Sequence, residues 1–193
     1  MIEQKSAVKK DRTTLSHKFF HFFSQKPFTN APNYGIIVPM IRNKNIIFDV
    51  DGTIADCNHR RKFVDGSQKK DWDAFRDATH LDTPIQHVCD MAKQHVADGD
   101  TVMFVSARNQ SQRDITVKQI QDWIGIDQPV LFLRPDGDFR SDDVFKKDVL
   151  DVVRDIIGGN PDVVYDDRNQ VVDMWRANGV NCVQVVPRNQ GDF

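Results

Sequence analysis

From residue 45 onward, short apolar segments alternate with segments of helical periodicity, and this alternation limits the folds open to the chain. Apolar runs predict strands at residues 45–48, 101–105, 130–133, 162–165 and 182–186. Helical spacing predicts helices between or after them, at residues 83–99, 111–124, 143–157 and 168–178. Continuous apolar strands joined through helices are typical of a parallel sheet with helices on both faces. We therefore expect an α/β fold, a Rossmann-like three-layer arrangement around a central parallel sheet of about five strands.

The first long helix carries a clear start signal. Thr83 is the expected N-cap, Pro84 suits the first helical position, and Gln86 completes a capping-box pattern. Before it, residues 54–82 interrupt the alternation with a polar stretch in which Trp72 and Phe75 stand at helical spacing. We expect a small helical cap insert over the strand ends there; a plain surface excursion is the alternative.

The first 44 residues differ in composition from the domain expected at 45–193. Residues 1–45 hold eight Lys and Arg against two Asp and Glu, a net charge of +6, whereas the remainder holds 18 against 26, a net charge of −8. The acidic body disfavours a dedicated duplex-binding domain. We expect a basic, disordered extension; a docking helix near residues 15–23 and a true start at Met40 are the alternatives.

The cysteines and the hydropathy of the sequence predict the cellular compartment of the protein. Cys57, Cys89 and Cys182 are scattered and lack C-x-x-C spacing, so we expect free thiols in a reducing compartment. No apolar run approaches the roughly 20 residues that span a bilayer, and the N-terminus lacks a secretory signal pattern. The prediction is a cytoplasmic protein without a membrane partner.

Chemistry-bearing side chains stand where predicted strands end. Asp49 and Asp51 follow the first strand; Gly52 allows a sharp turn, and Thr53 adds a hydroxyl and an N–H. Ligands bind beyond the carboxyl ends of such strands. Two crowded carboxylates suggest a cation or a shared proton, and phosphoryl transfer could use one as nucleophile and one as acid/base, with Mg²⁺. A calcium-binding loop would need Glu at its twelfth position, where Arg60 stands.

Further polar residues complete the set in chain order. Ser106 and Arg108 follow the second strand, Lys146 lies near the start of the helix after the third, and Asp166 and Asp167 follow the fourth. This ordered set resembles the haloacid dehalogenase superfamily of phosphotransferases. Within it, the chain from about Ile46 to Phe193 resembles the 3′-phosphatase domain of T-even phage polynucleotide kinase–phosphatases. The most specific stretches are Asp166–Arg176, Asp142–Lys146 and the closing Gly191-Asp192-Phe193.

The resemblance implies a role for each matching residue. The catalytic residues it implies are the nucleophile Asp49, the general acid/base Asp51, the phosphate-orienting Ser106 and the phosphate-pairing Lys146. The substrate-binding residues it implies are Thr53, Arg60, Arg108 and Asp142. The implied Mg²⁺ ligands are Asp49, Asp51 through its backbone carbonyl, Asp166 and Asp167.

Two departures from the resemblance stand out. The 193 residues contain no G-x-x-x-x-G-K-[ST], so the kinase half of the phage enzyme is missing, and Ala107 stands where the relative has Gly. The expected function is an Mg²⁺-dependent phosphomonoesterase that acts on 3′-phosphate ends of DNA or RNA. A nucleotidase for free nucleoside monophosphates is the enzymatic alternative, and a binding module with a vestigial site is the alternative from another class.

Overall fold

The computed structural model describes residues 43–65 and 69–191. They belong to one compact unit, Arg42–Phe193. The docking helix considered near residues 15–23 lies outside the described residues and stays a prediction. Among the residues that are described, no helix combines the length and the apolar character needed to cross a bilayer.

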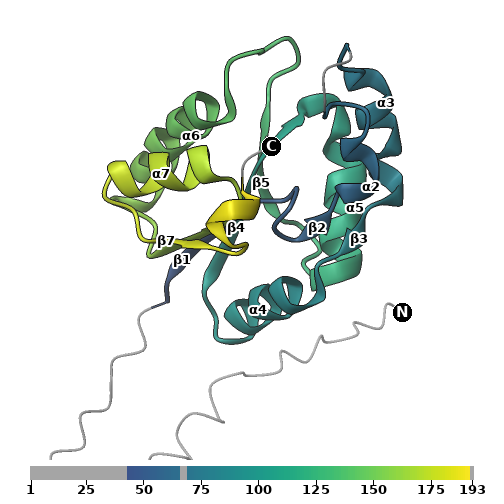
Figure 1. The fold of residues 1–193 in the computed structure, drawn as a ribbon. Coiled ribbons are helices and arrows are strands. Elements are labelled where there is room, and N and C mark those ends of the chain that lie inside the picture. Colours follow the sequence, from purple (N-terminus) through teal and green to yellow (C-terminus); the bar gives the residue numbers. More distant parts are fainter. Residues whose placement is uncertain (1–42, 66–68, 192–193) are drawn as a thin grey trace, which may run out of the picture. The chain divides into compact units, whose positions relative to one another are not determined.

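Five parallel strands form the central sheet (Figure 1). They are β1 (Asn45–Phe48), β4 (Thr101–Asn109), β5 (Val130–Arg134), β6 (Val163–Asp166) and β7 (Cys182–Gln184). Their order is β5-β4-β1-β6-β7, and each neighbouring pair is parallel. The chain crosses to opposite sides of β1, which creates the switch point where open α/β sheets bind ligands. The predicted α/β class and its parallel sheet are confirmed.

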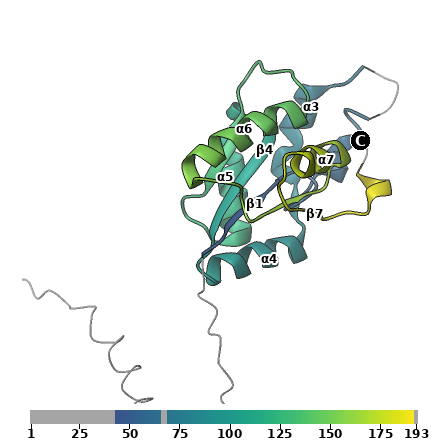
Figure 2. The ribbon, with the colours of Figure 1, turned by 90° about the vertical axis from the view of Figure 1, so that its left-hand side faces the viewer.

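Helices cover both faces of the sheet, because successive residues of a buried strand point to opposite sides. The helices are α4 (Gln86–Ala97), α5 (Arg113–Ile124), α6 (Asp142–Ile157) and α7 (Asn169–Ala177). Ile46 and Phe48 pack with residues of α4 and α5, and Ile47 packs with residues of α6 and α7. Figure 2 shows α6 and α7 above the strands and α4 below them. The result is the expected three-layer arrangement.

The segment between β1 and α4 forms a small insert. Its elements are β2 (Ala55–Asp56), α2 (Asn58–Arg61), α3 (Trp72–Asp77), the 3₁₀ helix η1 (Ala78–Leu81) and β3 (Thr83–Pro84). The helix predicted around Trp72 and Phe75 is present as α3. The antiparallel ribbon of β2 and β3 was not predicted.

The predicted start of the first long helix is wrong. Thr83 and Pro84 are strand residues paired with β2, and α4 begins only at Gln86. The Ile85 N–H donates to the Ile54 carbonyl at 2.9 Å, which keeps the chain extended up to the helix. Tertiary pairing therefore overrides the local capping signal.

Strand β4 continues further than predicted. It passes Ser106 and ends at Asn109, because its pairing with β5 resumes at Arg134 after a register shift. The shift is a bulge, a feature that often re-aims side chains at functional sites. The next helix starts through the 3₁₀ turn η2 (Gln110–Gln112), where Asn109 and Gln112 form the capping box. Ser106 and Arg108 thus lie on the strand itself.

Candidate active site

Side chains from β1, β6 and α6 meet at the carboxyl end of the sheet. The Lys146 Nζ donates to Asp49 Oδ1 at 2.6 Å and to Asp166 Oδ2 at 2.8 Å. Asp49 directly follows β1, Asp166 ends β6, and Lys146 comes from the second turn of α6. All three are buried. The fold therefore brings Lys146 to a carboxylate that lies 97 positions away in the chain.

The turn after β1 places Gly52 against Asp167. The N–H groups of the three residues after Gly52 all donate to the Val50 carbonyl, and Gly52 itself has a φ of +83°. A Cβ atom at position 52 would lie 2.0 Å from Asp167 Oδ2. Only glycine lets this turn and the Asp167 carboxylate occupy neighbouring space.

Three buried carboxylates crowd together at this point. Asp49, Asp166 and Asp167 offer oxygen atoms within 4.8 Å of one another. Burial, reinforced by Asp166, raises the pKa of Asp167 to about 7. Burial also raises the pKa of Asp49 well above its usual value, and Lys146 offsets this only in part. A divalent cation would relieve the repulsion, and Mg²⁺ takes carboxylate oxygens as ligands, so the donor set fits Mg²⁺.

Lys146 and Trp175 hold Asp166 in place. Burial alone would lower the pKa of Lys146, but Asp166 and Asp49 outweigh it, so the pKa stays above the ordinary value and the side chain remains an ammonium. The Trp175 indole N–H donates to Asp166 Oδ2 at 3.2 Å. Trp175 is fully buried. Its contact with Asp166 was not anticipated from the sequence.

The Asp51 carboxylate faces two arginines instead of the acidic cluster. Arg60 Nη2 and Arg108 Nη2 each donate to Asp51 Oδ1 at 2.6 Å. Burial alone would raise the pKa of Asp51, but Arg108 and Arg60 hold it below its ordinary value. In the part of the chain that is described, the metal-ligand cluster does not include the Asp51 side chain. Its expected metal contact through the backbone carbonyl stays a prediction.

Asp82, at the end of the insert, orients both arginines. Arg60 donates to it through Nε at 2.8 Å and Nη2 at 2.7 Å, and Arg108 Nη2 donates to it at 2.7 Å. Arg108 is fixed further by Gln119 Oε1 at 2.6 Å and Thr116 Oγ1 at 3.1 Å. The insert and the helix α5 thereby control where the two guanidinium groups point.

Ser106 and Asp142 lie at the same end of the sheet. Ser106 is buried, and its Oγ accepts from the Arg108 N–H at 3.3 Å. Asp142, the first residue of α6, accepts from Arg134 Nη2 at 2.5 Å and from Arg168. Arg134, the last residue of β5, thus ties two elements of the site together.

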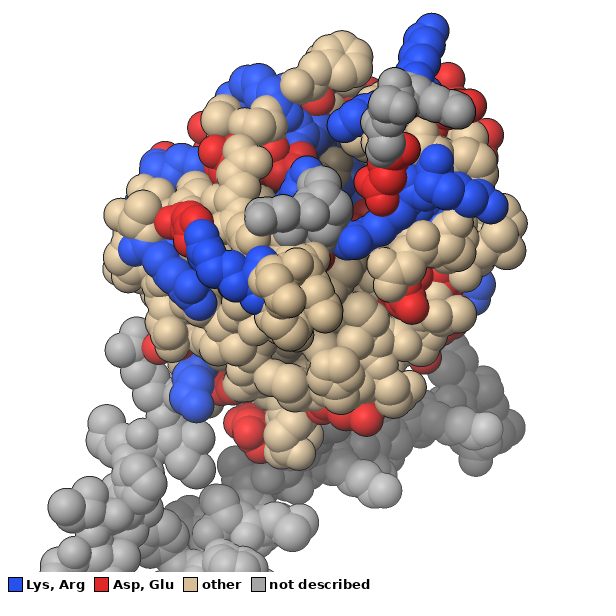
Figure 3. Space-filling view, viewed as in Figure 1, with Lys and Arg blue, Asp and Glu red and all other residues tan. Residues whose placement is uncertain are grey.

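These groups border a cavity of about 890 Å³, which is lined by side chains from the sheet end, the insert and the loop after β5. Figure 3 shows Lys and Arg atoms on both sides of the hollow at the top of the view. The lining includes the following predicted site residues: Asp49, Asp51, Ser106, Arg108, Asp142, Lys146 and Asp167.

Two residues expected to bind substrate do not line the cavity. Thr53 and Arg60 are completely buried. Arg60 lies behind Asp51 and reaches the site through that carboxylate. The Thr53 hydroxyl has no hydrogen-bond partner within the described residues, and it stays close to the site through the turn after β1. Both residues are buried away from the cavity lining in this structure, and substrate binding by Thr53 and Arg60 stays a prediction.

Sequence reasoning missed Asp82 and Arg134. A charged residue that ends the apolar strand β5 was an available signal for Arg134. Asp82 offered no such signal, because an Asp before a strand is common in loops and only the fold reveals its two buried arginines.

Solved structures share this fold. A chain of the Pnkp1/Rnl/Hen1 RNA repair complex matches with a TM-score of 0.60 and 26% identity, over 88% of this chain and 52% of that chain. A second structure of the Pnkp1/Rnl/Hen1 complex matches with a TM-score of 0.61 and 24% identity, over 98% and 58%. A hydrolase from Streptococcus pneumoniae TIGR4 matches with a TM-score of 0.51 and 13% identity, over 75% and 93%. This chain therefore spans about half the length of the two repair-complex chains.

Fold and site together define a phosphatase of the haloacid dehalogenase type, which is a phosphoric monoester hydrolase. The family model described as "Polynucleotide kinase PNKP phosphatase domain" matches residues 43–193. The chain belongs to this family.

Proposed function

We propose that this chain is an Mg²⁺-dependent phosphomonoesterase that removes 3′-phosphates from DNA or RNA ends through an aspartyl-phosphate on Asp49. The observation that carries the proposal is the position of Asp49, 2.6 Å from the Lys146 ammonium and beside a cavity that Asp51 also lines. A nucleophile, an acid/base and a cation for the phosphoryl oxygens are then within one site, as phosphoryl transfer requires.

The reaction would run in two displacements. An Asp49 carboxylate oxygen attacks phosphorus, and the bond between phosphorus and the sugar oxygen breaks. Asp51 gives its proton to that leaving oxygen. Asp51 then takes a proton from water as the water oxygen attacks the phosphorus of the aspartyl-phosphate, which releases inorganic phosphate and restores Asp49.

Arg60 and Arg108 affect how Asp51 acquires the proton that it donates to the leaving oxygen. In the substrate-free site, Arg108 and Arg60 keep the pKa of Asp51 low and the side chain ionised. A bound phosphate would compete for Arg108, which lines the cavity, and thereby raise the pKa of Asp51. Substrate binding would thus prepare the acid that the first step needs.

Charge on the transferred group needs stabilisation as well. The Ser106 hydroxyl and the Lys146 ammonium both border the cavity and would contact the equatorial phosphoryl oxygens. Asp49, the Asp51 backbone carbonyl and one or both of Asp166 and Asp167 would hold Mg²⁺, whose chemistry is to neutralise phosphoryl charge.

A nucleic acid end is the favoured substrate, supported by the family and by the RNA repair complex in which a similar chain occurs. A nucleotidase for free nucleoside monophosphates is the second candidate, favoured by the net charge of −8 outside residues 1–45. Release of phosphate should be compared, with Mg²⁺, for a 3′-phosphorylated oligonucleotide, a 5′-phosphorylated one and nucleoside monophosphates. We expect the 3′-phosphorylated oligonucleotide to react fastest; a preference for free nucleotides would replace the first candidate with the second.

The state of the three cysteines supports a cytoplasmic location. Cys57, Cys89 and Cys182 are free and buried. Free thiols suit a reducing compartment, so we assign the protein to the cytoplasm. Alkylation of intact cells before lysis, followed by mass spectrometry, should find all three cysteines unoxidised.

A further inference from the structure

Two exposed aromatic side chains stand at the mouth of the catalytic cavity. Phe139, in the loop between β5 and α6, is 94% exposed, and Trp72, the first residue of α3, is 48% exposed. A single exposed aromatic needs no explanation. These two differ because both line the cavity that also contains Asp49 and Lys146. Figure 1 shows α3 and the β5–α6 loop at the same end of the sheet.

A series of side-chain contacts connects Trp72 to Asp51, the proposed acid/base. Its ring meets Phe75 edge to face at a centroid distance of 5.8 Å and an interplanar angle of 81°. The Arg60 guanidinium lies 4.2 Å from the centroid of the Phe75 ring, and Arg60 in turn binds Asp51. These contacts fix the position of Trp72 relative to Asp51 and leave about half of the Trp72 surface exposed.

The loop that carries Phe139 is held in place by its neighbours. Arg134 Nη1 donates to the Arg140 carbonyl at 2.5 Å, and the Arg140 guanidinium clasps the Asp138 carboxylate at 2.7 Å. The residues on both sides of Phe139 are therefore tied down, while its ring remains in solvent. Because this backbone is already ordered, a ligand that packs against the ring has only the side chain of Phe139 to immobilise.

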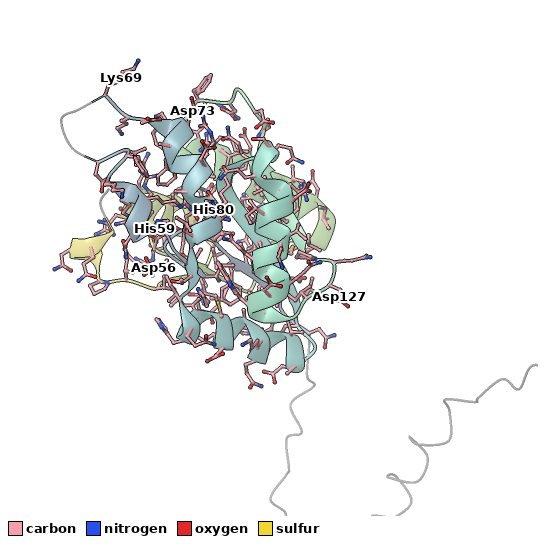
Figure 4. All side chains as sticks on the ribbon, turned by 90° about the vertical axis from the view of Figure 1, so that its right-hand side faces the viewer. Asp56, His59, Lys69, Asp73, His80 and Asp127 are labelled. Carbon is pink, nitrogen blue, oxygen red and sulfur yellow. The ribbon has the colours of Figure 1, made fainter. Side chains whose placement is uncertain are left out.

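Basic groups accompany the aromatic ones on the insert side. The Lys70 ammonium lies 5.5 Å from the centroid of the Trp72 ring. Lys69 is exposed and forms no ion pair with any residue that the structure describes. Figure 4 shows its side chain extending outward, away from the rest of the ribbon. The Trp72 ring with the Lys70 ammonium beside it suits a base, and the exposed Lys69 ammonium suits a phosphate of the backbone that carries the base.

We propose that Trp72 and Phe139 stack on unpaired bases of a single-stranded end, upstream of the phosphate that is removed. This inference rests on the proposed function and adds a subsite to it. Lys146 is 3% exposed and Phe139 is 94% exposed, so the ring lies outside the point where the phosphate reacts. A strand would occupy both places at once, whereas a mononucleotide would occupy only the inner one. The subsite therefore makes the enzyme prefer strands.

The test compares two substrates of the full chain with Mg²⁺: a 3′-phosphorylated single-stranded oligonucleotide and the corresponding nucleoside 3′-monophosphate. The readout is the ratio of their kcat/KM values. Phe139→Ala and Trp72→Ala should each lower this ratio about 5- to 160-fold, the range expected for loss of one base–aromatic stack. Phe139→Tyr, which keeps a ring, should preserve the ratio. Ile156→Ala, an exposed apolar residue of α6 outside the cavity lining, is the matched control.

The outcomes separate this inference from the proposed function. An unchanged ratio in both alanine variants, with an oligonucleotide preference in the wild type, would overturn the stacking subsite alone. A wild-type preference for the mononucleotide would overturn the proposed function and the subsite together. Lys69→Ala should lower oligonucleotide affinity for all sequences and reduce the salt slope by about 1, as for a phosphate contact.

Discussion

Asp82 accepts two hydrogen bonds from Arg60, from Nε at 2.8 Å and from Nη2 at 2.7 Å, and both side chains are buried. Because Arg60 and Arg108 also bind Asp51, the carboxylate of Asp82 sets the position of the proposed acid/base without lining the cavity. The insert therefore helps to position the proposed acid/base, and its residues also line the cavity.

Replacing Asp82 should therefore damage both stability and turnover. Asp82→Asn removes one of the two carboxylates that the buried guanidinium groups share and leaves them only Asp51, a change that costs about 1–3 kcal/mol of unfolding free energy. Displacement of Asp51 by an ångström lowers kcat by about 10²-fold. Denaturant unfolding and kcat at a temperature where the variant is folded measure the two effects. Asp122→Asn, in the exposed pair with Lys118, is the control, and equal stability of the two variants would contradict this role of Asp82.

Gly52 should be essential to the site for a steric reason. Gly52→Ala adds a Cβ atom 2.0 Å from Asp167 Oδ2 in a backbone with φ of +83°, so Asp167 has to move. We expect activity to fall by at least about 10²-fold and Mg²⁺ affinity, measured by calorimetry, to weaken. Gly125→Ala shares the positive φ but meets nothing within 4 Å, and it should cost only about 1 kcal/mol of stability. Equal activity of the two variants would contradict the clash with Asp167.

The acidic cluster should make stability depend on pH when Mg²⁺ is absent. The pKa of Asp167 is raised from 3.8 to about 7, so the folded state binds more protons than the unfolded state between these values. Stability in EDTA should therefore fall as pH rises from 3.8 to about 7. Mg²⁺ binds the ionised form, so its stabilising effect should be larger at the upper end of that window and above it than at the lower end.

Melting temperatures in EDTA and in Mg²⁺, taken at both ends of this pH range, measure the predicted dependence of stability on pH. Asp167→Asn removes one of the two carboxyl groups whose pKa burial raises, the other being Asp49, and should weaken the dependence. An increase in melting temperature on adding Mg²⁺ that is the same at both pH values would contradict a carboxylate metal site.

The sequence predicted four of the five strands well, because each of those four contains a continuous apolar run closed by a polar residue. Asn45–Phe48 matches β1 without error for that reason. The fifth, β7, ends at Gln184 and is two residues shorter than the predicted strand 182–186. The prediction from sequence failed at Thr83 and Pro84, where the capping signal was strong but the two residues pair with β2 instead. Local preference is decisive only where no distant strand competes.

The candidate site was predictable to the same extent. Asp49 and Asp166 could be found because parallel strands deliver their carboxyl ends to one edge, whereas Lys146, on the helix α6, was found through the family resemblance. The orientation of Asp51 could not, since it depends on Arg60 and Arg108, which are 9 and 57 positions away. Such buried charge networks are fixed by packing, which no local pattern encodes.

The most direct test of the account is phosphate release from a 3′-phosphorylated oligonucleotide with Mg²⁺ by the wild type and by Asp49→Asn. The substitution keeps the size of the side chain and removes its nucleophilic oxygen. It also removes a charge from a crowded acidic cluster, so the melting temperature should not fall. We predict a decrease in kcat of at least about 10³-fold with the fold intact. Phosphate release by Asp49→Asn at the wild-type rate would contradict the account.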